Sequence, residues 1–150
     1  MPDTALGDIK VLDLTHYIAG PYCTKLLADF GAEVIKIEPP GRGDPARNMG
    51  PFYRDEPHPE KSGLFLHLNT NKLGITLNLK TPEGVRIFKE LLKDADVVVE
   101  NFAPRVMPGL GLSYEELAEV NPSVVMTSIS NFGQTGPYRD FVATELTLFA

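Results

Sequence analysis

The sequence predicts an α/β fold in which a mostly parallel sheet is flanked by helices. Short β-branched, apolar segments alternate along the chain with longer segments whose apolar residues recur at helical spacing. The first two strand-like segments are joined by one helix-sized stretch, which implies a right-handed crossover and parallel strands. Apolar residues make up 43% of the 150 residues and charged residues 23%, which is typical of a globular chain rather than a disordered one.

The first unit is expected to be strand, helix, strand. Residues 9–14 and 33–38 are the two strands. Between them we expect a helix that opens at Pro21, which suits a first turn, and ends before Gly31, which suits a C-cap. Its buried stripe is predicted to consist of Cys23, Leu26, Leu27 and Phe30.

A long loop is expected over about residues 39–62. Residues 39–51 are so rich in Gly and Pro that neither helix nor strand is expected there. Arg42 and Arg47 lie in this stretch, and guanidinium groups on a Gly-rich loop suit an anionic ligand. A solvated loop in which these arginines pair with Asp44 is an equally open interpretation.

The second half continues the alternation of strands and helices. Residues 64–68 form a short apolar segment, and strands are expected over 75–79, 96–100 and 124–129. One helix is predicted after the N-cap Thr81, with an apolar face of Val85, Phe88, Leu91 and Leu92.

A capping box at Ser113 begins the next helix, which Asn121-Pro122 ends. Residues 133–140 are expected to be a polar loop, and another helix is expected from Thr144 onward. Because the sequence stops inside this apolar helical pattern, we expect the 150 residues to be a piece of a longer chain.

Charge and composition exclude several classes of function. The net charge of −6 argues against nucleic acid as a partner, because such binding needs a basic face. A single cysteine, Cys23, excludes an internal disulfide and a Cys-rich zinc site. The histidines lack metal-ligand spacing, so no metal is expected. No apolar stretch is long enough to span a membrane, and the start lacks the features of a signal peptide, so a cytoplasmic protein is expected.

The loops that follow the strands are the expected place for a ligand, because open parallel sheets bind ligands beyond the carboxyl ends of their strands. Four such loops stand out, over residues 15–20, 39–47, 101–105 and 130–136. The first lacks the Gly-x-Gly-x-x-Gly fingerprint, which argues against a nucleotide-dependent dehydrogenase. No Gly-x-Ser-x-Gly elbow of a serine hydrolase occurs either.

Short sequence blocks with a highly specific order and spacing cover nearly the whole chain. They lie at residues 9–15, 19–21, 27–39, 43–44, 69–72, 77–84, 95–102, 109–115 and 132–138. Together they resemble the N-terminal part of the family III CoA-transferases, which include formyl-CoA transferase, carnitine CoA-transferases and α-methylacyl-CoA racemases.

The resemblance implies a fold, a reaction and an assembly. Family members have a Rossmann-like large domain and a small domain, and two chains interlock into a homodimer. The reaction moves CoA from an acyl-CoA to a carboxylic acid through intermediates on a catalytic aspartate. That aspartate lies beyond the segment that matches Ala150. Residues 1–150 are therefore expected to be the N-terminal, CoA-binding portion, inactive by itself.

The resemblance also implies contacts with coenzyme A or acyl-CoA, which is the substrate. The matching positions are Ile18, Ala19, Pro39, Leu77, Asn78, Leu79, Lys80, Asn101, Phe102, Ala103, Val142, Ala143, Thr144 and Glu145. Pro39 stands where some members have an arginine that stacks on adenine, and Arg42 is the favoured substitute for it. Ala103 stands where many members have arginine, and Arg105 is close by. Glu145 matches a position beside the active site.

Two alternatives stay open at this point. An α-methylacyl-CoA racemase would need an acid/base histidine where this chain has Thr144, and a threonine hydroxyl cannot exchange protons in that way at neutral pH. A non-catalytic CoA-binding or interaction module is the other alternative, should the natural chain end at residue 150.

Overall fold

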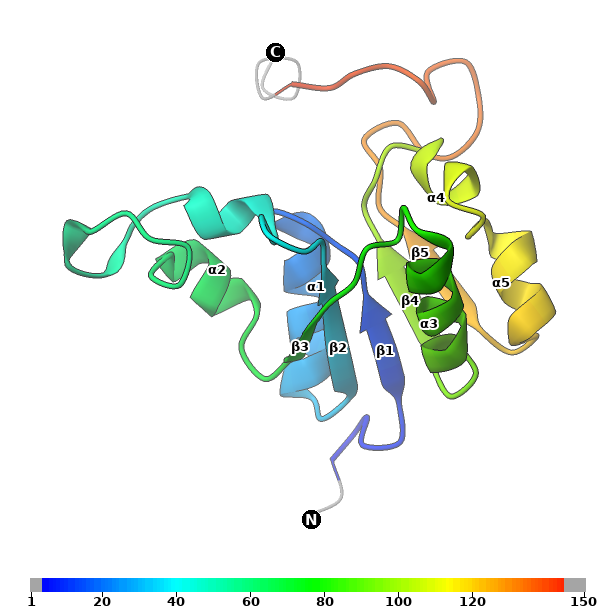
Figure 1. The fold of residues 1–150 in the computed structure, drawn as a ribbon, viewed down its shortest axis with the longest axis horizontal. Coiled ribbons are helices and arrows are strands. Elements are labelled where there is room, and N and C mark those ends of the chain that lie inside the picture. Colours follow the sequence, from blue (N-terminus) through cyan, green and yellow to red (C-terminus); the bar gives the residue numbers. More distant parts are fainter. Residues whose placement is uncertain (1–3, 145–150) are drawn as a thin grey trace.

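Five parallel strands make a single sheet in the order β3-β2-β1-β4-β5 (Figure 1). The strands are β1 (Lys10–Asp13), β2 (Glu33–Glu38), β3 (Leu73–Thr76), β4 (Val97–Glu100) and β5 (Val125–Ser128). This architecture comes from a computed structural model that describes residues 4–144. The predicted α/β fold with a parallel sheet is confirmed.

The strand order places a switch point between β1 and β4. From β1 the chain moves outward through β2 to β3, and it then returns to lay β4 on the opposite side of β1. The loops after β1 and β4 therefore leave the sheet side by side and in opposite directions. In open α/β sheets this is the crevice in which ligands bind.

Helices cover both faces of the sheet. The helices are α1 (Ala19–Asp29), α2 (Gly63–Leu68), α3 (Pro82–Leu92), α4 (Val106–Gly109) and α5 (Tyr114–Val120); all but α2, which packs against α1 and η1 (Pro45–Asn48), cover the sheet. One face of the sheet packs with α3, α4 and α5 around a core that includes Leu12 and Phe88. The other face packs against α1 through smaller side chains such as Val11 and Ala28. Successive strand residues thus enter opposite cores, as the pleat requires.

Local capping chemistry sets several helix ends where the sequence predicts them. The Thr81 hydroxyl accepts from the Gly84 amide at 3.1 Å, and Ser113 with Glu116 forms a reciprocal capping box. Gly31 follows α1 with a φ of +103°, a conformation that suits glycine. No helix among residues 4–144 is long and apolar enough to cross a membrane.

The predicted buried stripe of α1 is wrong for Leu26 and Phe30, whereas Leu27 is partly buried against the core that includes Val11. Leu26 and Phe30 are 40% and 60% exposed, and the buried residues of α1 are the smaller Gly20, Pro21, Thr24 and Ala28. The helix begins at Ala19, two residues before the predicted start, and it lies close to the strand ends. A Cβ on Gly20 would come within 2.3 Å of the Thr15 side chain, so close approach selects small residues on this face.

Three element assignments also change. The apolar segment 64–68 is helix α2, because the Ser62 hydroxyl caps it by accepting from the Phe65 amide. The third strand is Leu73–Thr76 rather than 75–79, since pairing with β2 runs from Ile35↔Leu73 to Glu38↔Thr76. The loop over 39–62 contains short 3₁₀ turns, η1 (Pro45–Asn48) and η2 (Tyr53–Asp55), where no helix was expected. The helix predicted from Thr144 lies outside the described residues.

Candidate functional site

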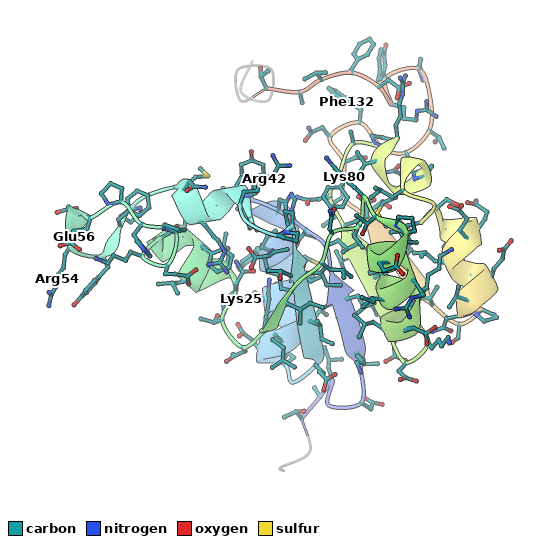
Figure 2. All side chains as sticks on the ribbon, in the orientation of Figure 1. Lys25, Arg42, Arg54, Glu56, Lys80 and Phe132 are labelled. Atoms are coloured by element: carbon teal, nitrogen blue, oxygen red, sulfur yellow. The ribbon has the colours of Figure 1, made fainter. Side chains whose placement is uncertain are left out.

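A cavity of about 910 Å³ opens at the carboxyl ends of β1, β4 and β5, and we call it the switch-point cavity. Its walls come from three loops that are distant in the sequence: residues 17–19, residues 101–105, and residues 129–132 with 139–144. Figure 2 shows Phe132 above this end of the sheet. The volume falls in the range of small-molecule sites, and the place is the one that strand order predicts for a ligand.

Asn101 ties the loops on the two sides of the switch point together. Its side-chain oxygen accepts from the His16 amide at 2.7 Å, and its side-chain nitrogen donates to the His16 carbonyl at 2.8 Å. The His16 ring also meets the Phe102 ring edge-on, with centroids 5.2 Å apart. These contacts fix the β1–α1 loop relative to β4, and thus fix one wall of the cavity.

A buried lysine on β2 holds the same loop from the other side. The Lys36 ammonium is 2% exposed, donates to the Thr15 carbonyl at 2.7 Å and lies 2.9 Å from Oδ2 of the fully buried Asp44. The other Asp44 oxygen accepts from the amide of Tyr17, whose φ is +65°. The Lys36–Asp44 pair therefore stabilises Tyr17 in the left-handed region at the cavity wall, a conformation that costs free energy in a residue other than glycine.

A second buried ion pair lies at the end of β1. Lys72 Nζ is 2.9 Å from Asp13 Oδ2, and the Thr24 hydroxyl donates to the same oxygen at 2.6 Å. Burial alone would raise the pKa of Asp13, but the charges of Lys36 and Lys72 and the hydroxyl hydrogen bonds hold that pKa below its ordinary value. Asp13 is therefore an anion that anchors α1 and the segment before β3 to β1.

Arg47 is committed to structure rather than to a ligand. It donates to both oxygens of Glu38, at 2.7 and 2.8 Å, and its guanidinium lies 3.7 Å from the centroid of the Phe65 ring. Of the two arginines in the Gly-rich loop, only Arg42 is exposed; the partners of Arg47 are Glu38 and Glu60, not Asp44.

Burial changes the titration of two groups near the cavity. It lowers the pKa of His16, so the ring is neutral at neutral pH and meets Phe102 as an uncharged aromatic. It raises the pKa of Glu100, although hydrogen bonds from Ser128 and the Phe102 amide favour the charged carboxylate. Neither residue lines the cavity; both support residues that do.

The structure brings together eight of the residues expected to contact CoA. The switch-point cavity is lined by Ala19, Asn101, Phe102, Ala103, Arg105, Val142, Ala143 and Thr144. Ile18, Pro39, Arg42, Leu77 and Asn78 do not line it, and Glu145 lies outside the described residues. Arg42 is exposed on the loop after β2, and Figure 2 shows it with Lys80 at the same end of the sheet.

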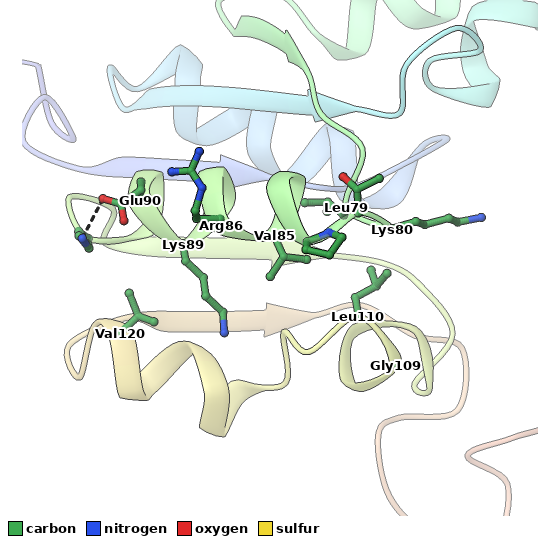
Figure 3. A pocket seen from close by; sticks show the side chains of 12 residues that line it. Leu79, Lys80, Val85, Arg86, Lys89, Glu90, Gly109, Leu110 and Val120 are labelled. Atoms are coloured by element: carbon green, nitrogen blue, oxygen red, sulfur yellow. Dashed lines mark hydrogen bonds and ion pairs between the residues drawn. The ribbon is translucent and has the colours of Figure 1, made fainter.

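The remaining two expected contacts, Leu79 and Lys80, line a different hollow. This flank groove of about 650 Å³ lies between α3 and the α4–α5 segment (Figure 3). Val85 and Leu110 face it, and Lys89 points across it, whereas Lys80 extends away. The groove lies on the side of the helices rather than at the strand ends, so the switch-point cavity is the better candidate site.

Sequence reasoning missed several residues of the cavity. Tyr17, Pro104, Arg139, Asp140 and Phe141 line it without having been singled out. The available signal was their position in loops that follow β1, β4 and β5. The supporting pairs of Lys36 and Lys72 were also missed, and a lysine inside the apolar run of β2 was the clue.

Comparison with known proteins gives consistent matches. The sequence model described as CoA-transferase family III matches residues 6–150. A succinyl-CoA–D-citramalate CoA-transferase of Chloroflexus aurantiacus is 48% identical over 139 residues, which cover 93% of this chain and 34% of that protein. A formyl-CoA:oxalate CoA-transferase of Afipia carboxidovorans is 46% identical over 136 residues, covering 91% of this chain and 31% of that protein.

A solved structure matches as well. The crystal structure of a CAIB/BAIF family protein from Brucella suis superposes with a TM-score of 0.86 at 36% sequence identity, and the match covers 97% of this chain and 38% of that one. The chain therefore spans about a third of the length of the curated relatives that it matches.

Proposed function

Because the chain belongs to CoA-transferase family III, we propose that it is the CoA-binding portion of an enzyme that moves coenzyme A from an acyl-CoA to a carboxylic acid. The observation that most directly supports this is the switch-point cavity, where three distant loops gather eight of the expected CoA contacts. The relatives' names each pair an acyl-CoA with a carboxylic acid: succinyl-CoA with D-citramalate, and formyl-CoA with oxalate.

The chemistry that we propose is covalent catalysis by a carboxylate outside this segment. An aspartate further along the full-length protein attacks the acyl-CoA carbonyl, which forms an acyl-aspartyl anhydride and releases CoA as the thiolate. The thiolate then attacks the aspartyl carbonyl, so that the donor acid leaves and an aspartyl-CoA thioester remains. The acceptor carboxylate displaces CoA from this thioester to form a second anhydride, and CoA attacks the acyl carbonyl of that anhydride to give the new acyl-CoA and the free aspartate. The two carboxylates that support the β1–α1 loop, those of Asp13 and Asp44, are fully buried and held by lysines. They are therefore built to position loops rather than to attack a substrate.

The contribution of this segment is to bind and orient the CoA moiety. The cavity offers the apolar walls of Phe102 and Phe141 together with the basic side chains of Arg105 and Arg139. Such a mixture suits a long ligand that carries phosphates at one end and an apolar arm at the other. In keeping with the family resemblance, we propose a homodimer as the working assembly and the cytoplasm as its compartment.

The proposal is tested with the full-length protein, succinyl-CoA or formyl-CoA, and a panel of mono- and dicarboxylic acids. We expect new acyl-CoA products by mass spectrometry, and a hydroxylamine-sensitive adduct on a carboxylate beyond residue 150. Absence of transfer for every pair, or an adduct on residues 1–150, would overturn the proposed reaction. Deuterium uptake from D₂O next to the thioester carbonyl without transfer would instead support the racemase.

A further inference from the structure

One carboxylate at the rim of the switch-point cavity is held by two arginines at once. Arg105 presents Nε at 3.1 Å and Nη2 at 2.9 Å to the two oxygens of Asp140. Arg139 presents the same two atoms to the same oxygens, at 3.2 and 2.9 Å. We call this arrangement the arginine clamp; all three side chains line the cavity.

The clamp has the geometry of an oxyanion site. Each guanidinium offers two parallel N–H donors, which is the fork that matches a carboxylate or a phosphate. Two forks that converge on one anion also leave a surplus of one positive charge. The hydrogen bonds of the two guanidinium groups are strong enough to lower the pKa of Asp140, which is thus anionic at neutral pH.

The clamp is also easy to open. Arg105, Arg139 and Asp140 are 74%, 42% and 39% exposed, and exposed ion pairs contribute little to stability. A ligand phosphate carries more charge than one carboxylate and accepts the same forks. Such a ligand therefore competes well for both guanidinium groups while Asp140 swings into solvent.

We propose that Arg105 and Arg139 bind an oxyanion of the ligand and that the Asp140 carboxylate holds the site until the ligand displaces it. This inference rests on the proposed function and names the charged group that the cavity takes. The oxyanion has three possible sources in this reaction: the 3′-phosphate of CoA, its pyrophosphate, or the carboxylate of the acid substrate.

Calorimetric titration of the full-length protein with CoA, dephospho-CoA and succinate tests the proposal. We expect Asp140→Asn to tighten binding about two- to fivefold, because it removes the internal competitor, and Arg139→Gln to weaken it about three- to tenfold. If the effect vanishes with dephospho-CoA, the 3′-phosphate is the bound group. If the effect of the substitutions persists with dephospho-CoA, the bound group is the pyrophosphate. If the effect appears only with succinate, the bound group is the carboxylate of the acid substrate.

Two control variants match these changes in charge. Lys10 and Glu33 form an ion pair 3.3 Å apart at the amino ends of β1 and β2, away from the cavity, and their side chains are 30% and 53% exposed. Glu33→Gln and Lys10→Gln should leave all three affinities unchanged. Equal affinities of Asp140→Asn, Arg139→Gln and the unsubstituted protein for every ligand would overturn the clamp proposal alone. A failure of the unsubstituted protein to bind CoA at all would overturn the proposed function with it.

Discussion

Carboxylates meet cationic side chains on both sides of the switch-point cavity, but at opposite degrees of exposure. Under the β1–α1 loop, Asp13 and Asp44 are fully buried and their lysine partners are 1–2% exposed. Across the cavity, the guanidinium groups that hold Asp140 are 42% and 74% exposed. Both sides pair an aspartate with a cation, lysine on one and arginine on the other, and they differ in burial as well as in the geometry of the cation.

Burial decides which pairs can exchange partners. Breaking a buried pair leaves an uncompensated charge in a medium of low dielectric constant, so such pairs fix geometry. An exposed pair gives up little when water or a ligand replaces one member. The lysine pairs therefore shape one wall of the cavity, and the arginine clamp is the part of the wall free to bind an anion.

The largest expected effect comes from removing a buried lysine charge. Lys36→Met keeps an unbranched side chain but leaves the Asp44 carboxylate buried and unpaired. We expect the free energy of unfolding of the full-length protein to fall by about 3–5 kcal/mol, measured by urea denaturation. The exposed Lys93, paired with Glu90, is the control, and Lys93→Met should change stability little. Equal effects of the two variants would break the contrast between buried and exposed pairs.

Removing the Asn101 side chain should have the next largest effect. Asn101→Ala loses both hydrogen bonds to the His16 backbone, which leaves an amide and a carbonyl unsatisfied. We expect a loss of about 1–3 kcal/mol in unfolding free energy and weaker CoA binding, because the cavity wall loosens. Asn48→Ala, at an exposed position in η1, is the matched control. Unchanged CoA affinity in Asn101→Ala would show that CoA binding does not depend on the hydrogen bonds between Asn101 and His16.

A smaller, pH-dependent effect is expected at Glu100. Burial raises its folded-state pKa above the ordinary 4.5, so its stabilising contribution is present below pH 4.5 and is lost as the pH rises through the folded-state pKa. Glu100→Gln can still accept from the Phe102 amide. Near neutral pH it should therefore match or exceed the unsubstituted protein in stability, by about 1 kcal/mol or less. Urea unfolding at several pH values measures this, and a clear loss of stability near neutral pH would contradict it.

The smallest effect on stability is expected at Arg42. Its side chain is exposed, unlike that of Arg47, which Glu38 holds. Arg42→Ala should leave the unfolding free energy unchanged and weaken CoA binding by about 1–3 kcal/mol in calorimetric titration. Equal CoA affinities would assign Arg42 to the solvated loop and leave Lys80 and the arginine clamp as the phosphate contacts.

Local chemistry explains what the sequence predicts well. The hydroxyls of Thr81 and Ser113 cap helices by accepting from amides only three positions away. Gly31 follows α1 with a positive φ, a conformation that glycine adopts readily. The loops after β1 and β4 were predicted as ligand sites because strand alternation alone places them at one edge. These features depend on residues that are close in the sequence or on the order of the elements.

Contacts between distant segments explain what was missed. The face that α1 buries depends on how closely it approaches Thr15, and the limits of β3 depend on pairing with β2. Arg105 was a candidate from the sequence, but its partner Asp140 lies 35 residues away in a loop without periodicity. The residues next to Lys36 in the sequence do not show that its ammonium group contacts the Thr15 carbonyl and the Asp44 carboxylate.

Hydrogen–deuterium exchange of the full-length protein, with and without CoA, shows which hollow of this segment CoA occupies. If CoA occupies the switch-point cavity, exchange should slow in peptides that cover residues 15–19, 101–105 and 129–144, since these loops line or support its walls. Peptides over residues 85–93, on the flank groove, should exchange as before. Protection confined to residues 85–93, with the three loops unchanged, would contradict the account.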